Sequence, residues 1–188
     1  MTDQVLWYVS RATGLVGLLL LTAAVVLGAL GGARSGPPGW PRFVVGAVHR
    51  NVSLLALAFL AVHVAAAVVD PYAGIGWLDA VLPFGSVYKA FWLGLGAVAG
   101  DLFLAVLATS LLRVRIGARW WRAVHWATYA CWPLAVAHGL GTGGADSRLW
   151  WVLAVTAACV VAVVLAVGWR ITAVHPDTRA RSGERVGP

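Results

Sequence analysis

The chain contains five long apolar stretches, and this pattern constrains its fold more than any other feature. Each stretch can cross the hydrocarbon core of a bilayer, which takes about 20 residues in an α-helix. The predicted spans are residues 5–31, 43–69, 87–113, 119–141 and 149–171. Because 61% of the residues are hydrophobic and only 11% are charged, little sequence remains for a soluble domain. We therefore expect an all-α, polytopic membrane helix bundle, multi-pass in the cell (plasma) membrane.

The bundle is expected to fill residues 1–175 as one domain, followed by a disordered, basic cytoplasmic tail at 176–188. Glycine, proline and polar residues separate the apolar stretches, as is typical of loops. The first stretch is long and glycine-rich and has no small-residue cleavage site, so we interpret it as a retained helix and not as a signal peptide.

Basic residues are distributed unevenly between the two sides of the predicted bundle. Loops that stay in the cytoplasm keep an excess of Lys and Arg. The basic residues on the richer side are Arg34, Arg42, Arg50, Arg113, Arg115, Arg119, Arg122, Arg170, Arg179, Arg181 and Arg185. Only Arg11, Lys89 and Arg148 remain for the other side. This bias predicts the N-terminus outside and the C-terminus inside. Together with anionic lipid headgroups, it explains the formal charge of +7 without a nucleic-acid partner.

Four of the five histidines lie in predicted spans, as two pairs. His49 and His63 are 14 residues apart in the second span, and His125 and His138 are 13 apart in the fourth. These separations correspond to about 21 Å and about 20 Å along a helix. Both spans start at a basic cytoplasmic loop, so they run in the same direction. His49 and His125 should therefore share an inner level, and His63 and His138 an outer one.

Imidazoles paired at two levels are suited to hold two haem irons axially. Ionisable groups at membrane depth are costly and usually functional. The alternative is that each histidine is a buried residue hydrogen-bonded to a neighbour. Zinc or copper is disfavoured because no Cys, Asp or Glu completes a compact ligand set at either level. We predict haem iron as the metal and these four histidines as its ligands.

The 13-residue spacing does not suit an ideal helix. Fourteen residues turn a side chain by about 40°, whereas 13 residues turn it by about 140°. The fourth span must therefore be distorted or tilted. Pro133 lies between the two histidines and could produce a kink, or it could be an incidental proline of the kind that membrane helices tolerate.

The histidine spacings, with the strings Val-His-Arg-Asn at 48–51 and Ser-Arg-Ala at 10–12, resemble those of the ferric reductase-like transmembrane domain. This domain is shared by bacterial ferric reductase-like proteins, by the haem-binding membrane subunit of the periplasmic methionine sulfoxide reductase system and by the membrane half of NADPH oxidases. The resemblance covers nearly the whole chain. It implies that His49 pairs with His125 on an inner b-type haem, and His63 with His138 on an outer one.

Two departures from the oxidases limit what the resemblance implies. Their last helix leads into a flavin and nicotinamide domain, whereas here a tail of about 17 residues follows the fifth span, so we expect a separate electron donor. In superoxide-producing oxidases a further histidine follows the outer ligand of the second span by four residues, and here this position is Ala67. Deliberate superoxide production is therefore not expected.

Arg11, Arg50 and Asp101 are further candidates for functional residues within the spans. Arg11 lies at the depth of the outer histidines, where it could neutralise a haem propionate or extend to the lipid headgroups. Arg50 could serve an inner propionate or anchor the helix in the interface. Asp101 lies near the midplane, where it could couple protons to electron transfer or make a structural hydrogen bond. We assign Arg11 and Arg50 to cofactor binding and leave Asp101 open.

The sequence thus predicts a carrier of electrons through two haem b groups, from a cytoplasmic donor to an external acceptor. The donor is a flavin reductase or a quinol, which would bring or share a flavin or quinone. The acceptor is a ferric chelate or a redox partner protein. The chain is expected to act as the electron-transfer membrane subunit of an oxidoreductase, and whether it is itself an enzyme is left open. The alternatives are a quinol-linked dihaem cytochrome b and a haem-free membrane scaffold or small transporter.

Overall fold

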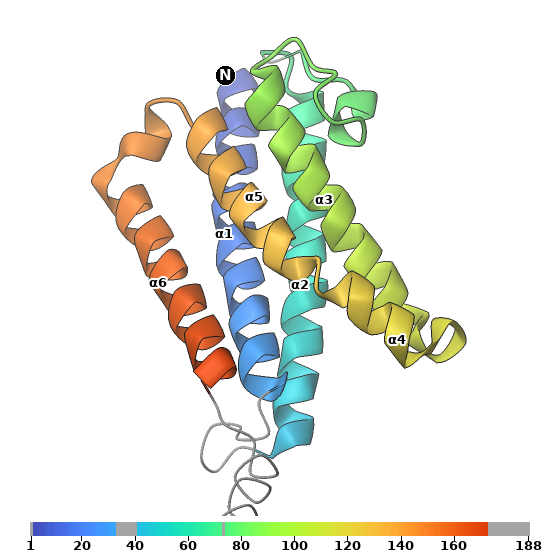
Figure 1. Ribbon diagram of the computed structural model, residues 1–188. Helices are drawn as coiled ribbons and strands as arrows, with labels where there is room; N and C mark the ends of the chain where they lie inside the picture. The colour runs from blue at the N-terminus through green and yellow to red at the C-terminus, as the bar shows by residue number, and fades with distance from the viewer. Residues whose placement is uncertain (1, 33–40, 73, 173–188) are drawn as a thin grey trace, which may run out of the picture.

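The computed structural model describes residues 2–32, 41–72 and 74–172, and within these ranges it contains helices and no strands (Figure 1). The expected tail at 176–188 lies outside the described residues. The elements are α1 (Thr2–Gly32), α2 (Arg42–Val69), the 3₁₀ helix η1 (Trp77–Ala80), α3 (Ala90–Leu111), α4 (Arg113–His125), α5 (Thr128–Thr142), the 3₁₀ helix η2 (Asp146–Arg148) and α6 (Trp150–Thr172).

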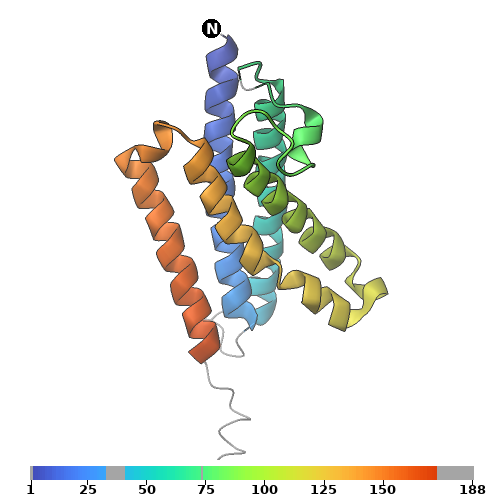
Figure 2. The same cartoon turned by 45° about the horizontal axis from the view of Figure 1, so that its top comes forward.

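Four of the described helices, α1, α2, α3 and α6, are long and apolar enough to cross a membrane. The N-terminus lies at one end of the bundle, which we call the upper end, and α1 and α2 run antiparallel along its length (Figures 1 and 2). Helix α1 packs most extensively against α2, and α3 against α5, whereas α2 and α5 make little direct contact. The two histidine-bearing segments therefore do not pack extensively against each other.

The predicted span at 119–141, which the histidine spacing requires to be distorted or tilted, is not one helix. It is divided into α4 and α5 by a turn at Trp126 and Ala127. The Ala127 and Tyr129 amides donate to carbonyls three residues earlier, at Val124 and Trp126, as in a 3₁₀ helix. Pro133 lies inside α5, about two turns after the break. The distortion expected from the 13-residue spacing is present, but it is not a kink at the proline.

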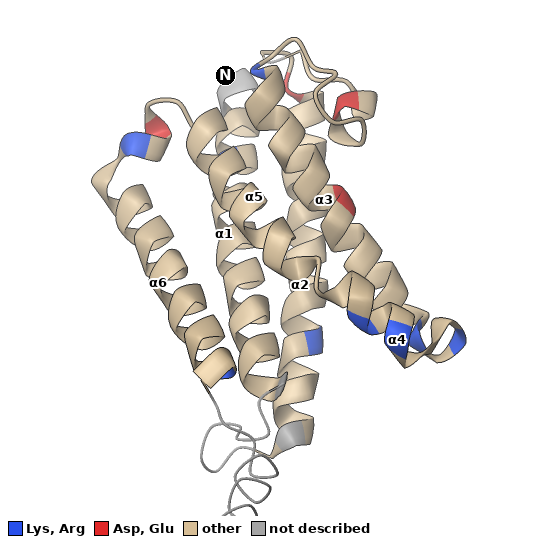
Figure 3. Cartoon of the chain, viewed as in Figure 1, with Lys and Arg blue, Asp and Glu red and all other residues tan. Residues whose placement is uncertain are grey.

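The basic segment at 113–122 is mostly helical and forms most of α4. Gly117 has φ 78°, which interrupts this helix near its middle. Helix α4 turns away from the direction of α5 (Figures 1 and 2), and basic residues gather on it, whereas the acidic residues lie on α3 and at the upper end (Figure 3). The asymmetry of charge seen in the sequence is therefore also an asymmetry between the two ends of the structure.

The buried core lies between the two histidine levels. Its members are Leu21, Val25, Ala56, Ala99, Phe103, Cys131, Trp132, Cys159 and Val163. The Trp132 indole Nε1 donates to the Thr22 hydroxyl at 2.9 Å, so this large side chain is buried with its polar atom satisfied. The core fixes α5 against α1 and α3, and it thereby sets the heights at which α5 and α4 present their histidines.

Candidate haem sites

The four histidines meet in two facing pairs, one at each level. The ring centroids of His63 and His138 lie 6.1 Å apart at the upper level, with 87° between the ring planes. Those of His49 and His125 lie 6.4 Å apart at the lower level, with 63° between the planes. The structure thus brings together the same partners that the sequence predicts to share a depth.

These separations suit two imidazoles that share one metal ion. With metal–nitrogen bonds of about 2.0 Å on opposite sides of the ion, the ring centroids lie about 6.3 Å apart. The described residues contain no group of three or more His, Cys, Asp or Glu side chains that could hold a metal ion. A pair of axial imidazoles needs no further protein ligand when a porphyrin supplies the other four nitrogens. The donor set therefore fits haem iron at both levels.

Hydrogen bonds fix the orientation of three of the four rings. Their Nδ1 atoms lie within hydrogen-bond distance of backbone carbonyl oxygens: His49 of Ala24 at 3.0 Å, His63 of Ser10 at 2.8 Å and His138 of Trp92 at 2.9 Å. A carbonyl only accepts, so each Nδ1 carries the proton and donates it. Nε2 is then left with a free lone pair, which is the arrangement found in metal-ligating histidines.

The same three rings pack against glycines of a neighbouring helix. A Cβ built on Gly14 would lie 2.9 Å from His63, one on Gly28 3.4 Å from His49, and one on Gly96 2.3 Å from His138. In each case the accepting carbonyl lies four residues before the glycine. One turn of helix separates these positions, so the missing side chain opens the path by which the imidazole reaches the carbonyl.

His125 is held differently. Its Nδ1 atom is buried and has no hydrogen-bond partner among the described residues. Its ring lies instead beside that of Trp121, with centroids 5.1 Å apart and an interplanar angle of 34°. It is the last residue of α4, and the Thr128 hydroxyl donates to its backbone carbonyl across the break. The break in the fourth predicted span is therefore located at a candidate ligand.

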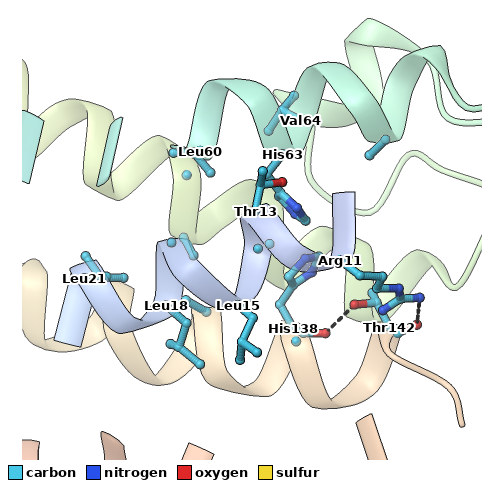
Figure 4. Close-up of a pocket in the computed structure, with 18 of the residues that line it drawn as sticks. Arg11, Thr13, Leu15, Leu18, Leu21, Leu60, His63, Val64, His138 and Thr142 are labelled. Atoms are coloured by element: carbon cyan, nitrogen blue, oxygen red, sulfur yellow. Dashed lines mark hydrogen bonds between the residues drawn. The ribbon is translucent and has the colours of Figure 1, made fainter. Parts of the chain in front are cut away.

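A cavity of about 710 Å³ extends from the upper histidine pair toward the core. Arg11 lines this cavity beside both histidines (Figure 4). Its guanidinium donates to the Thr142 carbonyl at 2.9 Å and lies 4.2 Å from the centroid of the Trp7 ring. Such a volume is within the range of ligand pockets. Arg11 thus lies at the level of the upper histidines, and its role in cofactor binding stays a prediction.

Small residues shape the upper cavity. A Cβ on Gly17 or Gly100 would meet nothing within 4 Å, and both glycines line the cavity. Part of η1 also lines it, through Asp79 and Ala80, so the loop after α2 covers the upper site. Asp101 is half-buried on α3 and lines the same cavity, and its role stays open.

A second cavity, of about 180 Å³, adjoins the lower pair. It is lined by His49 and His125 together with two arginines, Arg122 from α4 and Arg170 from α6. Arg50 is exposed and is not among the lining residues. In the sequence, Arg122 and Arg170 contribute to the charge bias that predicts the orientation, and nothing there places them at this site. No local motif marks them, since their position depends on how α4 and α6 pack.

The fold defines a class, a multi-pass membrane protein, and the two facing imidazole pairs lie between its helices. The chain belongs to the family of ferric reductase like transmembrane components, whose family model matches residues 13–136. The resemblance inferred from the histidine spacing is thereby confirmed. No curated protein and no solved structure matches the chain.

Family membership indicates transmembrane electron transfer, and domains of this family generally bind haem. The matched residues include His49, His63 and His125, but they begin after Arg11 and stop before His138. His138 and Arg11 are therefore connected to the upper site by its geometry and not by the family match.

Proposed function

We propose that this protein passes electrons through two b-type haems, one at each histidine level, from a cytoplasmic donor to an extracytoplasmic acceptor. The observation that supports this most directly is that two imidazole pairs face each other, with ring centroids 6.1 and 6.4 Å apart. The ligands are His63 and His138 at the upper level, and His49 and His125 at the lower one. A bound haem b would supply one-electron exchange at its iron.

The chain itself supplies the nitrogen ligands, their orientation and their spacing. Nδ1 bonds to carbonyls hold three rings with Nε2 free. Helix α2 is continuous between His49 and His63, which sets the two levels about 21 Å apart. Apolar side chains make up most of the lining of the upper site. Arg11 supports an anionic group at the upper site through the N–H donors that its bond to Thr142 leaves free.

The orientation in the membrane follows from charge. The lower end carries the arginines of α4 and Arg170 (Figure 3), so we place it in the cytoplasm. In this arrangement α5, extended by the end of α4, makes the fourth of five crossings. A flavin reductase or a quinol would donate, and a ferric chelate or a redox protein would accept.

The purified full-length protein tests this proposal. Its reduced-minus-oxidised spectrum should show a b-type band, with two haems per chain. In liposomes, a membrane-impermeant reductant outside should reduce a trapped ferric chelate inside, and the variant His63→Ala/His125→Ala, which lacks a ligand at each level, should not support this transfer. Absence of a b-type band from the wild-type protein would reject the proposal.

A further inference from the structure

The lower cavity contains a pair of arginines that the ligand geometry does not require. Arg122 and Arg170 come from different helices, α4 and α6, and line the same small cavity as His49 and His125. Arg170 is half-buried, and a guanidinium inside a membrane bundle is costly unless an anion or several acceptors compensate it, whereas Arg122 is exposed. Two cationic groups at one cavity suit an oxyanion.

Arg170 is held in place from two sides. Its Nη1 donates to the Gly28 carbonyl at 3.2 Å, and its guanidinium carbon lies 5.6 Å from the centroid of the Trp126 ring. Gly28 is the glycine against which the His49 ring packs. Arg170 thus lies between the helix that supports one lower ligand and the segment that follows the other. Its remaining N–H groups are available to a ligand in the cavity.

Arg122 precedes His125 by three residues on α4. Its Nε donates to the Ala118 carbonyl of its own helix at 3.2 Å, which leaves its two terminal nitrogens. The described chain offers these arginines no acidic partner at the cavity. The acidic residues whose side chains the structure describes are Asp70, Asp79, Asp101 and Asp146, and none of them lines this site.

We infer that Arg122 and Arg170 form a clamp for the propionate carboxylates of the porphyrin at the lower level. This inference rests on the proposed function. Guanidinium groups bind carboxylates through paired, charge-assisted hydrogen bonds, and two arginines match the two propionates that a haem b carries. A lipid phosphate offers similar oxygen atoms to the same site. The clamp makes α6 part of the lower site, although α6 carries no histidine ligand.

The test compares Arg170→Gln and Arg122→Gln with Arg119→Gln in the full-length, haem-loaded protein. Arg119 is an exposed residue of the same basic helix and does not line the cavity, so it is the matched control. Reduction adds negative charge to a haem, and a nearby cation favours it. Each cavity variant should therefore lower the ratio of reduced to oxidised lower haem about tenfold at a fixed potential, or about 59 mV for one electron. The upper haem should change less than about twofold, and Arg119→Gln should change neither haem.

The lower haem is identified in the titration as the component that disappears in His125→Ala. Arg170→Lys should lower the ratio of reduced to oxidised lower haem less than Arg170→Gln does, because lysine keeps the charge but loses the planar fork. Titrations in lipid-depleted detergent and in bilayer nanodiscs distinguish the two oxyanions: a propionate ligand predicts the same effect in both, and an effect seen only with lipid would assign the arginines to a headgroup and overturn the inference. Equal behaviour of all three Gln variants, in a protein with two haems, would also overturn it while leaving the proposed function intact. A protein without haem would instead reject the proposed function.

Discussion

The imidazole of His63 lies directly against Gly14, where a Cβ would be 2.9 Å from the ring. Fourteen residues further along α1, Gly28 faces His49, which is 14 residues before His63 on α2. Because α1 and α2 are antiparallel, equal steps along the two helices keep the same register. The 14-residue spacing of the histidines therefore has a counterpart in the glycines of the helix that supports them.

Gly96 provides the most sensitive test of this arrangement. A Cβ there would lie 2.3 Å from Nδ1 of His138, so Gly96→Ala should displace the ring and break its bond to the Trp92 carbonyl. The alanine itself favours a helix by up to about 1 kcal/mol, so a loss cannot come from helix propensity. We expect haem content to fall from two to one per chain, measured after extraction of the pigment.

The matched control for this change is Gly46→Ala. Gly46 is an exposed glycine of α2, its Cβ would meet nothing within 4 Å, and it lines neither cavity. It should retain both haems. If Gly96→Ala also kept two haems with an unchanged spectrum, contact with the glycine would not be what positions His138.

Substitution of Gly14 should weaken haem binding more than substitution of Gly28, because the added Cβ would lie closer to a histidine ring. Gly14→Ala would place a Cβ 2.9 Å from His63, whereas Gly28→Ala would place one 3.4 Å from His49. The second distance needs only a small shift of the ring. Gly14→Ala should therefore weaken the upper haem strongly, and Gly28→Ala should weaken the lower haem slightly. The temperature at which each haem is released, followed by its absorbance, measures both effects, and the reverse order would contradict the packing argument.

Variants of Arg11 and Lys89 distinguish a role at the cofactor from a role in stabilising the end of α5. Both donate to the Thr142 carbonyl, at 2.9 and 3.2 Å, near the end of α5. Only Arg11 also lines the upper cavity. Arg11→Gln should lower the ratio of reduced to oxidised upper haem about tenfold at a fixed potential, because a cation is lost where negative charge is added.

In the same titration, Lys89→Gln should change this ratio less than about twofold, because its ammonium lies outside the cavity. Equal changes in the two variants would mean that Arg11 only stabilises the end of α5. The experiment therefore decides between the two interpretations of Arg11 that the sequence left open.

The helical spans could be predicted because apolarity and length together specify a membrane crossing. The predicted bounds of four spans, at 5–31, 43–69, 87–113 and 149–171, agree with α1, α2, α3 and α6 to within a few residues. The break at Trp126 could not be predicted from apolarity. At the break, backbone amides donate to carbonyls three residues earlier instead of four. This local geometry depends on how α4 packs and on the contact of His125 with His49.

The histidine pairing could be predicted because depth in a bilayer follows from residue number and helix direction. The groups that hold the rings could not be predicted in the same way. Ser10, Ala24 and Trp92 act through backbone carbonyls, which every residue type carries, so side-chain identity gives no signal. The 14-residue separation of Gly14 and Gly28, equal to that of His49 and His63, is the one pattern that could have indicated two of these contacts.

Haem content of paired double variants tests the central claim, that each haem is held by one histidine from α2 and one from the α4–α5 segment at the same level. His63→Ala/His138→Ala removes both ligands of one level and should keep one haem per chain. His63→Ala/His125→Ala removes one ligand from each level and should keep none. A wild-type protein without pigment would contradict the account, and so would loss of both haems from His63→Ala/His138→Ala.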